Sequence, residues 1–216
     1  MTKTILVTGG TGYIGSWVVK ELLEKGYRVR VPVRSFNKKD KYLHLKNLPN
    51  SINLLELFEA DLLVDGAFDK AAEGADAIIH MASPFTLRFK DPQRDLVDPA
   101  VKGTRNVLGA ASKSSTVKRV VLTSSVAAVH GDNIDMEEQG LTEFTEENFN
   151  ITSSLKHQPY SFSKVQAERE AWRINAEQSK WELVVINPAL VLGPSLTGNS
   201  NSESLQIMKD LLSGKY

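Results

Sequence analysis

Short apolar runs alternate with longer amphipathic segments along this chain of 216 residues. The runs are rich in β-branched residues and apolar throughout, which is typical of strands that are buried on both faces of a parallel sheet. We therefore predict strands at residues 4–8, 27–33, 52–58, 76–82, 118–125 and 181–187.

The segments between these runs carry apolar residues at helical spacing. Ile14, Val18 and Leu22 share one face of a predicted helix over 13–25, and Gly26 follows as its C-cap. The alternation predicts an α/β fold: a doubly wound parallel (Rossmann) sheet, formed by residues 1–216 as one domain, with helices on both faces. Further helices are predicted over 93–113, 160–179 and 203–213.

Two prolines and one irregular segment interrupt this pattern. Pro32 removes a hydrogen-bond donor from a strand inside the sheet, and Pro99 interrupts a helical pattern. Each is predicted to mark a strand end or a kink. Residues 126–158 form a long irregular stretch, and long loops in compact domains are usually functional.

Composition narrows the class of ligand. The 26 basic and 26 acidic residues give a formal charge of zero, so a small molecule is a better candidate than nucleic acid or an anionic membrane. There are no cysteines and no apolar run of signal-peptide or membrane-spanning length, so we expect a cytoplasmic protein without disulfides. The four histidines lack metal-ligand spacing, and no metal is predicted.

Residues 8–15 read TGGTGYIG and lie between the first predicted strand and the first predicted helix. Gly10, Gly12 and Gly15 fit GxGxxG, and Gly9 makes the related GxxGxxG fit equally. Such glycines allow a tight turn and let backbone N–H groups reach a pyrophosphate, to which the helix N-terminus adds partial positive charge. We favour dinucleotide binding over a purely structural turn. The predicted cofactor contacts are Gly9, Gly12, Tyr13, Ile14 and Gly15.

The second predicted strand is followed by Arg34, and then by Lys38, Lys39 and Lys41. NAD-binding proteins usually carry an acid here, which would repel a 2′-phosphate, whereas a guanidinium binds one bidentately. The predicted cofactor is therefore NADP (NADPH). A solvated basic loop is the alternative, and it explains Arg34 poorly. Asp61, after the third predicted strand, is either a partner for the adenine amine or a simple turn residue.

Tyr160 and Lys164 are four residues apart and so share a face of the predicted helix. An ammonium near a phenol favours the phenolate and lowers its pKa, which would make Tyr160 a usable proton shuttle. Ser124 and Ser125 close the fifth predicted strand, at the edge where open α/β sheets bind ligands. Such serines are often only caps, but beside Tyr160 a hydroxyl can hold a carbonyl oxygen.

The motifs TGGTGYIG, LTSSVAAVHGD and YSFSK resemble those of the extended short-chain dehydrogenase/reductases, and the resemblance covers the whole chain. GSWVVKELLEKGYRVRVPVR, HMASPF, VKGTRNVL and NPALVLGP are similar to the subgroup of dihydroflavonol, cinnamoyl-CoA and microbial carbonyl (aldehyde) reductases. The resemblance implies Tyr160 as the acid, Lys164 as its partner and ribose ligand, and Ser125 rather than Ser124 as the carbonyl anchor. It also implies cofactor contacts from Arg34, Lys41, Asp61, Leu62, Ala82, Ser83, Pro188 and Leu190.

The resemblance has two further implications. The wider superfamily often carries a catalytic asparagine where this chain has Pro99 and Ala100, so a proton relay there must use water or backbone. The resembling family also continues with a small helical lobe over the substrate, which we expect to be largely missing from residues 1–216. That lobe, residues 126–158 and the segment Phe85 to Phe89 are expected to determine the substrate.

We therefore predict an NADPH-dependent reductase, in which hydride passes to an aldehyde or ketone carbon, Tyr160 protonates the oxygen and Ser125 steadies it. An NAD-dependent sugar-nucleotide epimerase or dehydratase is an alternative, against which Arg34 counts. A non-catalytic NADP-sensing regulator is another, and it would have no need for Ser125, Tyr160 and Lys164.

Overall fold

The computed structural model describes residues 2–83, 89–197 and 202–215. In these residues six strands form one parallel sheet in the order β3-β2-β1-β4-β5-β6. All carboxyl ends of the strands therefore lie at one edge. The strands are β1 (Thr4–Thr8), β2 (Arg28–Val33), β3 (Leu55–Glu59), β4 (Ala77–His80), β5 (Arg119–Thr123) and β6 (Glu182–Ile186).

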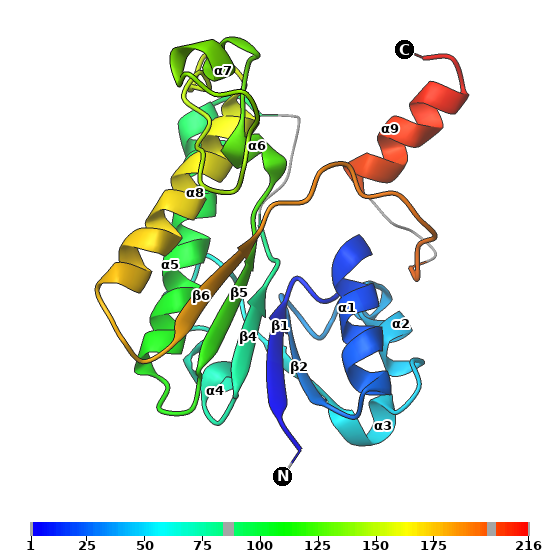
Figure 1. Ribbon diagram of the computed structural model, residues 1–216. Coiled ribbons are helices and arrows are strands. Elements are labelled where there is room, and N and C mark those ends of the chain that lie inside the picture. The colour runs from blue at the N-terminus through cyan, green and yellow to red at the C-terminus, as the bar shows by residue number, and fades with distance from the viewer. Residues whose placement is uncertain (1, 84–88, 198–201, 216) are drawn as a thin grey trace.

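Helices cover both faces of the sheet (Figure 1). The helices α5 (Asp98–Lys113) and α8 (Pro159–Ala176) lie on one face, and α1 (Tyr13–Glu24) lies on the other with α2 (Leu43–Lys46) and α3 (Ser51–Leu54). This confirms the doubly wound α/β fold. The remaining elements are η1 (Lys39–Lys41), α4 (Asp69–Ala72), the π-helical turn η2 (Gln93–Val97), α6 (Val126–Val129), α7 (Ile134–Glu138) and α9 (Glu203–Leu212).

Two apolar layers hold the helices to the sheet. Fully burying an aliphatic side chain contributes about 1.5–3 kcal/mol, so these layers stabilise the arrangement that positions the strand ends. On the α5–α8 side the fully buried strand residues are Leu6, Ile78 and Val120, and on the α1 side they are Val7, Val29 and Val31.

The prediction of a strand over 52–58 is partly wrong, because Ser51–Leu54 is a helical turn and β3 begins only at Leu55. Asn50 has a left-handed backbone (φ 62), and Leu54 N–H donates to Asn50 O at 3.1 Å. An apolar run of this length does not distinguish a strand from a short helix.

Pro32 lies inside β2 rather than at its end. Arg30 makes the last pair between β2 and β1, whereas Val33 O accepts from Ala60 N on the β3 side. Since alternate residues of a strand direct their backbone groups to opposite sides, the nitrogen of Pro32 faces the region beyond the β1 pairing, where no donor is needed. Pro99 lies in the first turn of α5, directly after η2, so the predicted interruption of the 93–113 helix is present.

The segment 126–158 and the segment after β6 both lie at the carboxyl edge (Figure 1). The first contains the short helices α6 and α7. Asn150 Nδ2 donates to Ala127 O at 2.9 Å, which connects the later part of this segment to α6. No helix in the described part of the chain is long and apolar enough to cross a membrane. Among those same residues, no group of three or more His, Cys, Asp or Glu side chains is placed to hold a metal ion.

Candidate active site

The glycine loop between β1 and α1 forms a closed, tightly packed turn. Gly9 has a left-handed backbone (φ +70), and a Cβ on it would lie 2.8 Å from Ala82 N. Gly12 N–H donates to Gly9 O at 2.9 Å, and a Cβ on Gly15 would collide with the same oxygen. Glycine is therefore required at positions 9 and 15 for this turn to form.

The first turn of α1 is suited to an anion. No side chain caps this helix, and its first turn contains no acidic residue. The backbone N–H groups of Tyr13 and Ile14, the first two residues of α1, are thus free of side-chain acceptors at the positive end of the helix dipole. This arrangement fits the pyrophosphate of a dinucleotide.

The residues after β2 provide positive charge. Arg34 is exposed, and its guanidinium has no hydrogen bond or ion pair within the described residues. Lys41 lies in η1, and within the described ranges its side chain makes only a 3.7 Å surface ion pair with Asp40. Such a pair contributes little and leaves the charge accessible.

The predicted adenine neighbours lie after β3. Asp61 is exposed, and its Oδ1 accepts from Leu63 N at 2.8 Å, so it has the geometry of a turn residue. Leu62 is buried and its side chain belongs to the apolar layer on the α5–α8 side.

Four other predicted contacts lie along the carboxyl edge. Ala82 and Ser83 follow β4, and Ala82 N donates to Thr8 Oγ1 at 3.2 Å. Pro188 O accepts from Val126 N at 3.0 Å, which brings the segment after β6 beside Ser125, while Leu190 is about half exposed. Residues 84–88, which include most of the predicted specificity segment, lie outside the described residues.

Ser125, Tyr160 and Lys164 form one cluster. Ser125 is the N-cap of α6, where its Oγ accepts from Ala127 N at 3.1 Å, and its side chain is also hydrogen-bonded to Tyr160. Tyr160 is the second residue of α8, and Lys164 follows one turn later with its Nζ 5.7 Å from the centroid of the Tyr160 ring. Ser125 is thus both a cap and a partner of the candidate proton donor.

Burial dominates the electrostatics of this cluster. It raises the pKa of Tyr160 to about 12, against the opposing effect of the hydrogen bond to Ser125. It lowers the pKa of Lys164 to about 8. The expected net lowering of the Tyr160 pKa is therefore wrong for the protein alone, because desolvation of the phenolate outweighs the effects that lower this pKa. The phenol stays protonated at neutral pH, which suits a proton donor.

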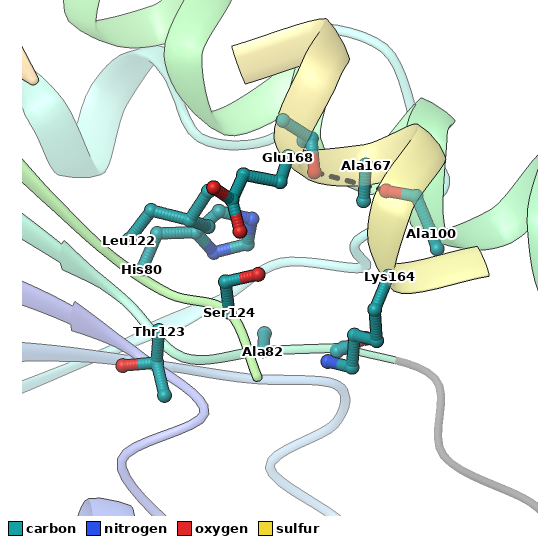
Figure 2. A pocket seen from close by; sticks show the side chains of 11 residues that line it. His80, Ala82, Ala100, Leu122, Thr123, Ser124, Lys164, Ala167 and Glu168 are labelled. Atoms are coloured by element: carbon teal, nitrogen blue, oxygen red, sulfur yellow. Dashed lines mark hydrogen bonds between the residues drawn. The ribbon is translucent and has the colours of Figure 1, made fainter. Parts of the chain in front are cut away.

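A small cavity lies beside Lys164, between residues of β4, β5, α5 and α8 (Figure 2). His80, Ser124, Lys164 and Glu168 line it, and its volume of about 20 Å³ is enough for one water molecule. Ser124 Oγ is buried without a hydrogen-bond partner among the described residues. Ala100 also lines the cavity, so the position where the wider superfamily often has asparagine borders a space that water can fill.

Sequence reasoning missed Glu168 and Asn187. Glu168 is buried one turn after Lys164, and Asn187 Nδ2 donates to Glu168 Oε2 at 2.9 Å and to Ser125 O at 3.2 Å. Asn187 thereby joins the ends of β5 and β6 to α8. The spacing of Tyr160, Lys164 and Glu168, four residues each, places all three on one helix face and could have pointed to Glu168.

His80 is a buried residue whose side chain bonds to the neighbouring strand β1. Its Nδ1 lies 2.7 Å from Thr8 Oγ1, which already accepts the N–H groups of Met81 and Ala82 at 3.2 Å, so the hydroxyl donates its proton to His80. Burial, with a smaller effect from the charge of Lys164, lowers the pKa of His80 to about 3. His80 is therefore neutral near pH 7 and links β1 to β4.

A family model, described as the NAD dependent epimerase/dehydratase family, matches residues 5–214. The chain is 42% identical to a cinnamoyl-CoA reductase from Medicago truncatula, over 98% of this chain and 64% of that protein. It is 40% identical to a putative anthocyanidin reductase from Ginkgo biloba, over 99% of this chain and 62% of that protein.

Among solved structures, the chain is similar to the yeast methylglyoxal/isovaleraldehyde reductase Gre2 complexed with NADPH. The TM-score is 0.75 with 32% identity, and the match covers 89% of this chain and 59% of that one. These similarities confirm the predicted resemblance to the reductase subgroup. The chain spans less than two thirds of the length of each of these proteins.

Proposed function

This chain belongs to the NAD dependent epimerase/dehydratase family, and from that premise we propose that it is the cofactor-binding and catalytic part of an NADPH-dependent reductase of aldehydes or ketones. The observation that carries the proposal is the contact between Ser125 and Tyr160, with Lys164 buried one turn further along α8. The relatives named as reductases support a carbonyl group as the substrate.

The residues of the cluster have distinct roles in this proposal. NADPH, when bound, supplies the hydride for the carbonyl carbon. The Ser125 hydroxyl donates a hydrogen bond to the carbonyl oxygen, and Tyr160 transfers its proton to that oxygen as negative charge develops. The Lys164 ammonium stabilises the phenolate left on Tyr160.

NADPH rather than NADH is inferred from the residues after β2. Arg34, exposed and without an ion-pair partner in the described chain, supplies a guanidinium for a 2′-phosphate, and Lys41 adds a second charge. The glycine loop and the uncapped start of α1 would hold the pyrophosphate. The NADPH in the yeast reductase structure supports this assignment.

A substrate lobe beyond residue 216 is part of the same proposal. Val184 and Ile186 of β6 are 38% and 49% exposed, and their neighbours Leu183 and Val185 belong to the layer under α5 and α8. Alternate strand residues face opposite sides, so a further element on the α1 side would bury Val184 and Ile186. The cytoplasmic location expected from the sequence also stays a prediction.

The proposal is tested by mixing the protein with NADPH and a panel of small aldehydes and ketones while nicotinamide absorbance is followed. Turnover of at least one carbonyl is the expected result. NADPH binding without any turnover would favour the sensing regulator. A tightly held NAD that is recycled during turnover would favour the epimerase or dehydratase.

Tyr160→Phe is the matched variant for this test, because it removes only the phenolic hydroxyl. We expect it to keep the parental NADPH affinity and to lose on the order of 100-fold or more in turnover. NADPH affinity is measured by titration alongside the rate. If Tyr160→Phe reduced carbonyls at the parental rate, Tyr160 would not be the proton donor.

A further inference from the structure

The helix that carries Tyr160 begins at a strained residue. Gln158, its N-cap, has φ 53 and ψ 55, in the left-handed region that side chains other than glycine rarely adopt. The next residue is Pro159, which itself favours an extended conformation at position 158. Among the described non-glycine residues only Asn50 also has a positive φ. Since Tyr160 follows two residues later, this turn determines where the phenol is presented.

One carboxylate holds both residues of the turn. Asp132 Oδ1 accepts from Gln158 Nε2 at 2.6 Å, and Asp132 Oδ2 accepts from His157 Nε2 at 2.7 Å. Gln158 Oε1 accepts from Ser161 Oγ at 3.2 Å, so the Gln158 side chain is held at both polar atoms. The left-handed conformation is thus tied to a residue outside the helix.

Asp132 belongs to the segment that carries the other catalytic hydroxyl. It follows α6, whose N-cap is Ser125, and its N–H donates to Thr152 Oγ1 at 2.9 Å. A Cβ on Gly131 would collide with the same Thr152 hydroxyl, so this loop is packed closely in place. Asp132 therefore connects the position of Ser125 to that of Tyr160.

We propose that Asp132 is a positioning residue: its carboxylate stabilises the left-handed turn at Gln158 and so fixes Tyr160 against Ser125. This inference rests on the proposed reductase function. The side chains of Asp132 and His157 are 40% and 52% exposed, and an isolated surface pair contributes little. Asp132 differs from such an isolated pair because its two hydrogen-bond donors, His157 and Gln158, are adjacent residues of one strained turn.

Substitutions at position 158 separate backbone strain from the hydrogen bond. Gln158→Ala and Gln158→Gly both remove the amide, but only glycine adopts the left-handed backbone freely. We expect Asp132→Ala and Gln158→Ala each to lower kcat about tenfold or more, because a displacement of about 1 Å can cost about 100-fold. Gln158→Gly should keep a kcat near the parental value. The double variant Asp132→Ala/Gln158→Gly should be faster than Asp132→Ala alone, and NADPH affinity should be unchanged throughout.

Asp69→Ala is the matched control. Asp69 also makes a 2.7 Å ion pair and has a 39% exposed side chain, but it lies in α4, away from the carboxyl edge (Figure 1). Its loss should leave kcat unchanged. A parental kcat in Asp132→Ala, or a double variant no faster than Asp132→Ala, would overturn the proposal.

Amide hydrogen exchange provides a readout that needs no turnover. Phe162 N–H donates to Gln158 O at 3.0 Å, so Asp132→Ala should speed exchange in the first turns of α8, and adding Gln158→Gly should restore protection. If the parent protein reduced no carbonyl, the proposed reductase function would be refuted. The exchange measurement would still test whether Asp132 stabilises the turn at Gln158. Unchanged exchange in Asp132→Ala would refute the role of Asp132.

Discussion

At the scale of single residues, one physical cause gives Tyr160 and Lys164 different properties. Burial disfavours the charged form of each side chain. Burial therefore raises the pKa of Tyr160 to about 12, so the phenol stays protonated. It lowers the pKa of Lys164 to about 8, so the ammonium loses its proton more easily. Tyr160, the proposed proton donor, thus keeps its proton near neutral pH, whereas Lys164 loses its charge as the pH rises through about 8.

Carbonyl reduction is accordingly expected to slow as the pH rises through about 8. The Lys164 ammonium is intact below that pH and is lost above it, while Tyr160 stays protonated. The rate should fall about tenfold per pH unit on the alkaline side. Lys164→Arg, whose guanidinium keeps its proton, should lack this decline even if its maximum rate is lower. A parental rate that stayed level up to about pH 10 would contradict the prediction.

Cofactor preference is expected to depend strongly on Arg34. A charge-assisted contact of Arg34 with a 2′-phosphate contributes about 1.5–3 kcal/mol, or roughly tenfold or more in affinity. Arg34→Ala should therefore weaken NADPH binding and leave NADH binding unchanged, as measured by titration with each nucleotide. Lys118→Ala, an exposed charge at the opposite edge of the sheet, is the control and should change neither. Equal affinity of the parent for both nucleotides would refute the inference.

At the scale of elements, the site exists because a parallel sheet brings distant segments to one edge. Ser125 follows β5 as the N-cap of α6, Tyr160 and Lys164 come from α8, and the glycine loop follows β1. Asn187, after β6, ties the first two of these segments together. The geometry of the candidate site therefore depends on strand register as well as on the side chains of the site.

The link between the central strands β1 and β4 should make stability depend on pH. The pKa of His80 is about 3 when folded, below its ordinary value of 6.5, so the unfolded chain binds the extra proton between those values and stability falls as the pH drops through them. The loss is up to about 1.4 kcal/mol per pH unit. His80→Gln, which keeps an acceptor for the Thr8 hydroxyl, should lose less. Urea unfolding of both proteins at about pH 7 and about pH 5 measures the difference, and parallel losses would contradict it.

Features that depend on local sequence could be predicted from it. The glycine turn, the Tyr160 and Lys164 spacing and the strand-end position of Ser125 follow from neighbours along the chain, and the structure has each of them. The limit appears at Ser51–Leu54, where an apolar run begins as a helical turn. There the left-handed backbone of Asn50 precedes a helical turn instead of a strand. Composition does not reveal this backbone conformation.

Features that depend on packing could not be predicted. The raised pKa of Tyr160 results from burial by segments far away in sequence. The buried Glu168 and the strained Gln158 depend on Asn187 and Asp132, which the fold brings to them from other segments. Spacing alone can suggest such residues as candidates, but only three-dimensional contacts show which groups each side chain binds.

At the scale of the whole molecule, the two faces of the sheet are covered unequally. The apolar layer under α5 and α8 extends to Leu183 in β6, whereas the layer on the α1 side involves strand residues only as far as β4. Val184 and Ile186 consequently remain exposed on that side, and beyond β6 the chain crosses the carboxyl edge towards α9 (Figure 1). The exposed apolar face lies next to the edge that holds the catalytic cluster.

Because one face of the sheet is incompletely covered, residues 1–216 alone should behave differently from a version extended through the natural reading frame. The glycine loop, Arg34 and the catalytic cluster all lie within residues 1–216, so both proteins should bind NADPH with similar affinity. The shorter one should have a lower kcat/KM, because the proposed lobe would orient the carbonyl and shield it from water. It should also self-associate through the exposed face, and Val184→Thr combined with Ile186→Thr should reduce the light scattering. Equal kcat/KM in the two proteins would show that residues 1–216 suffice for catalysis and that no substrate lobe is needed.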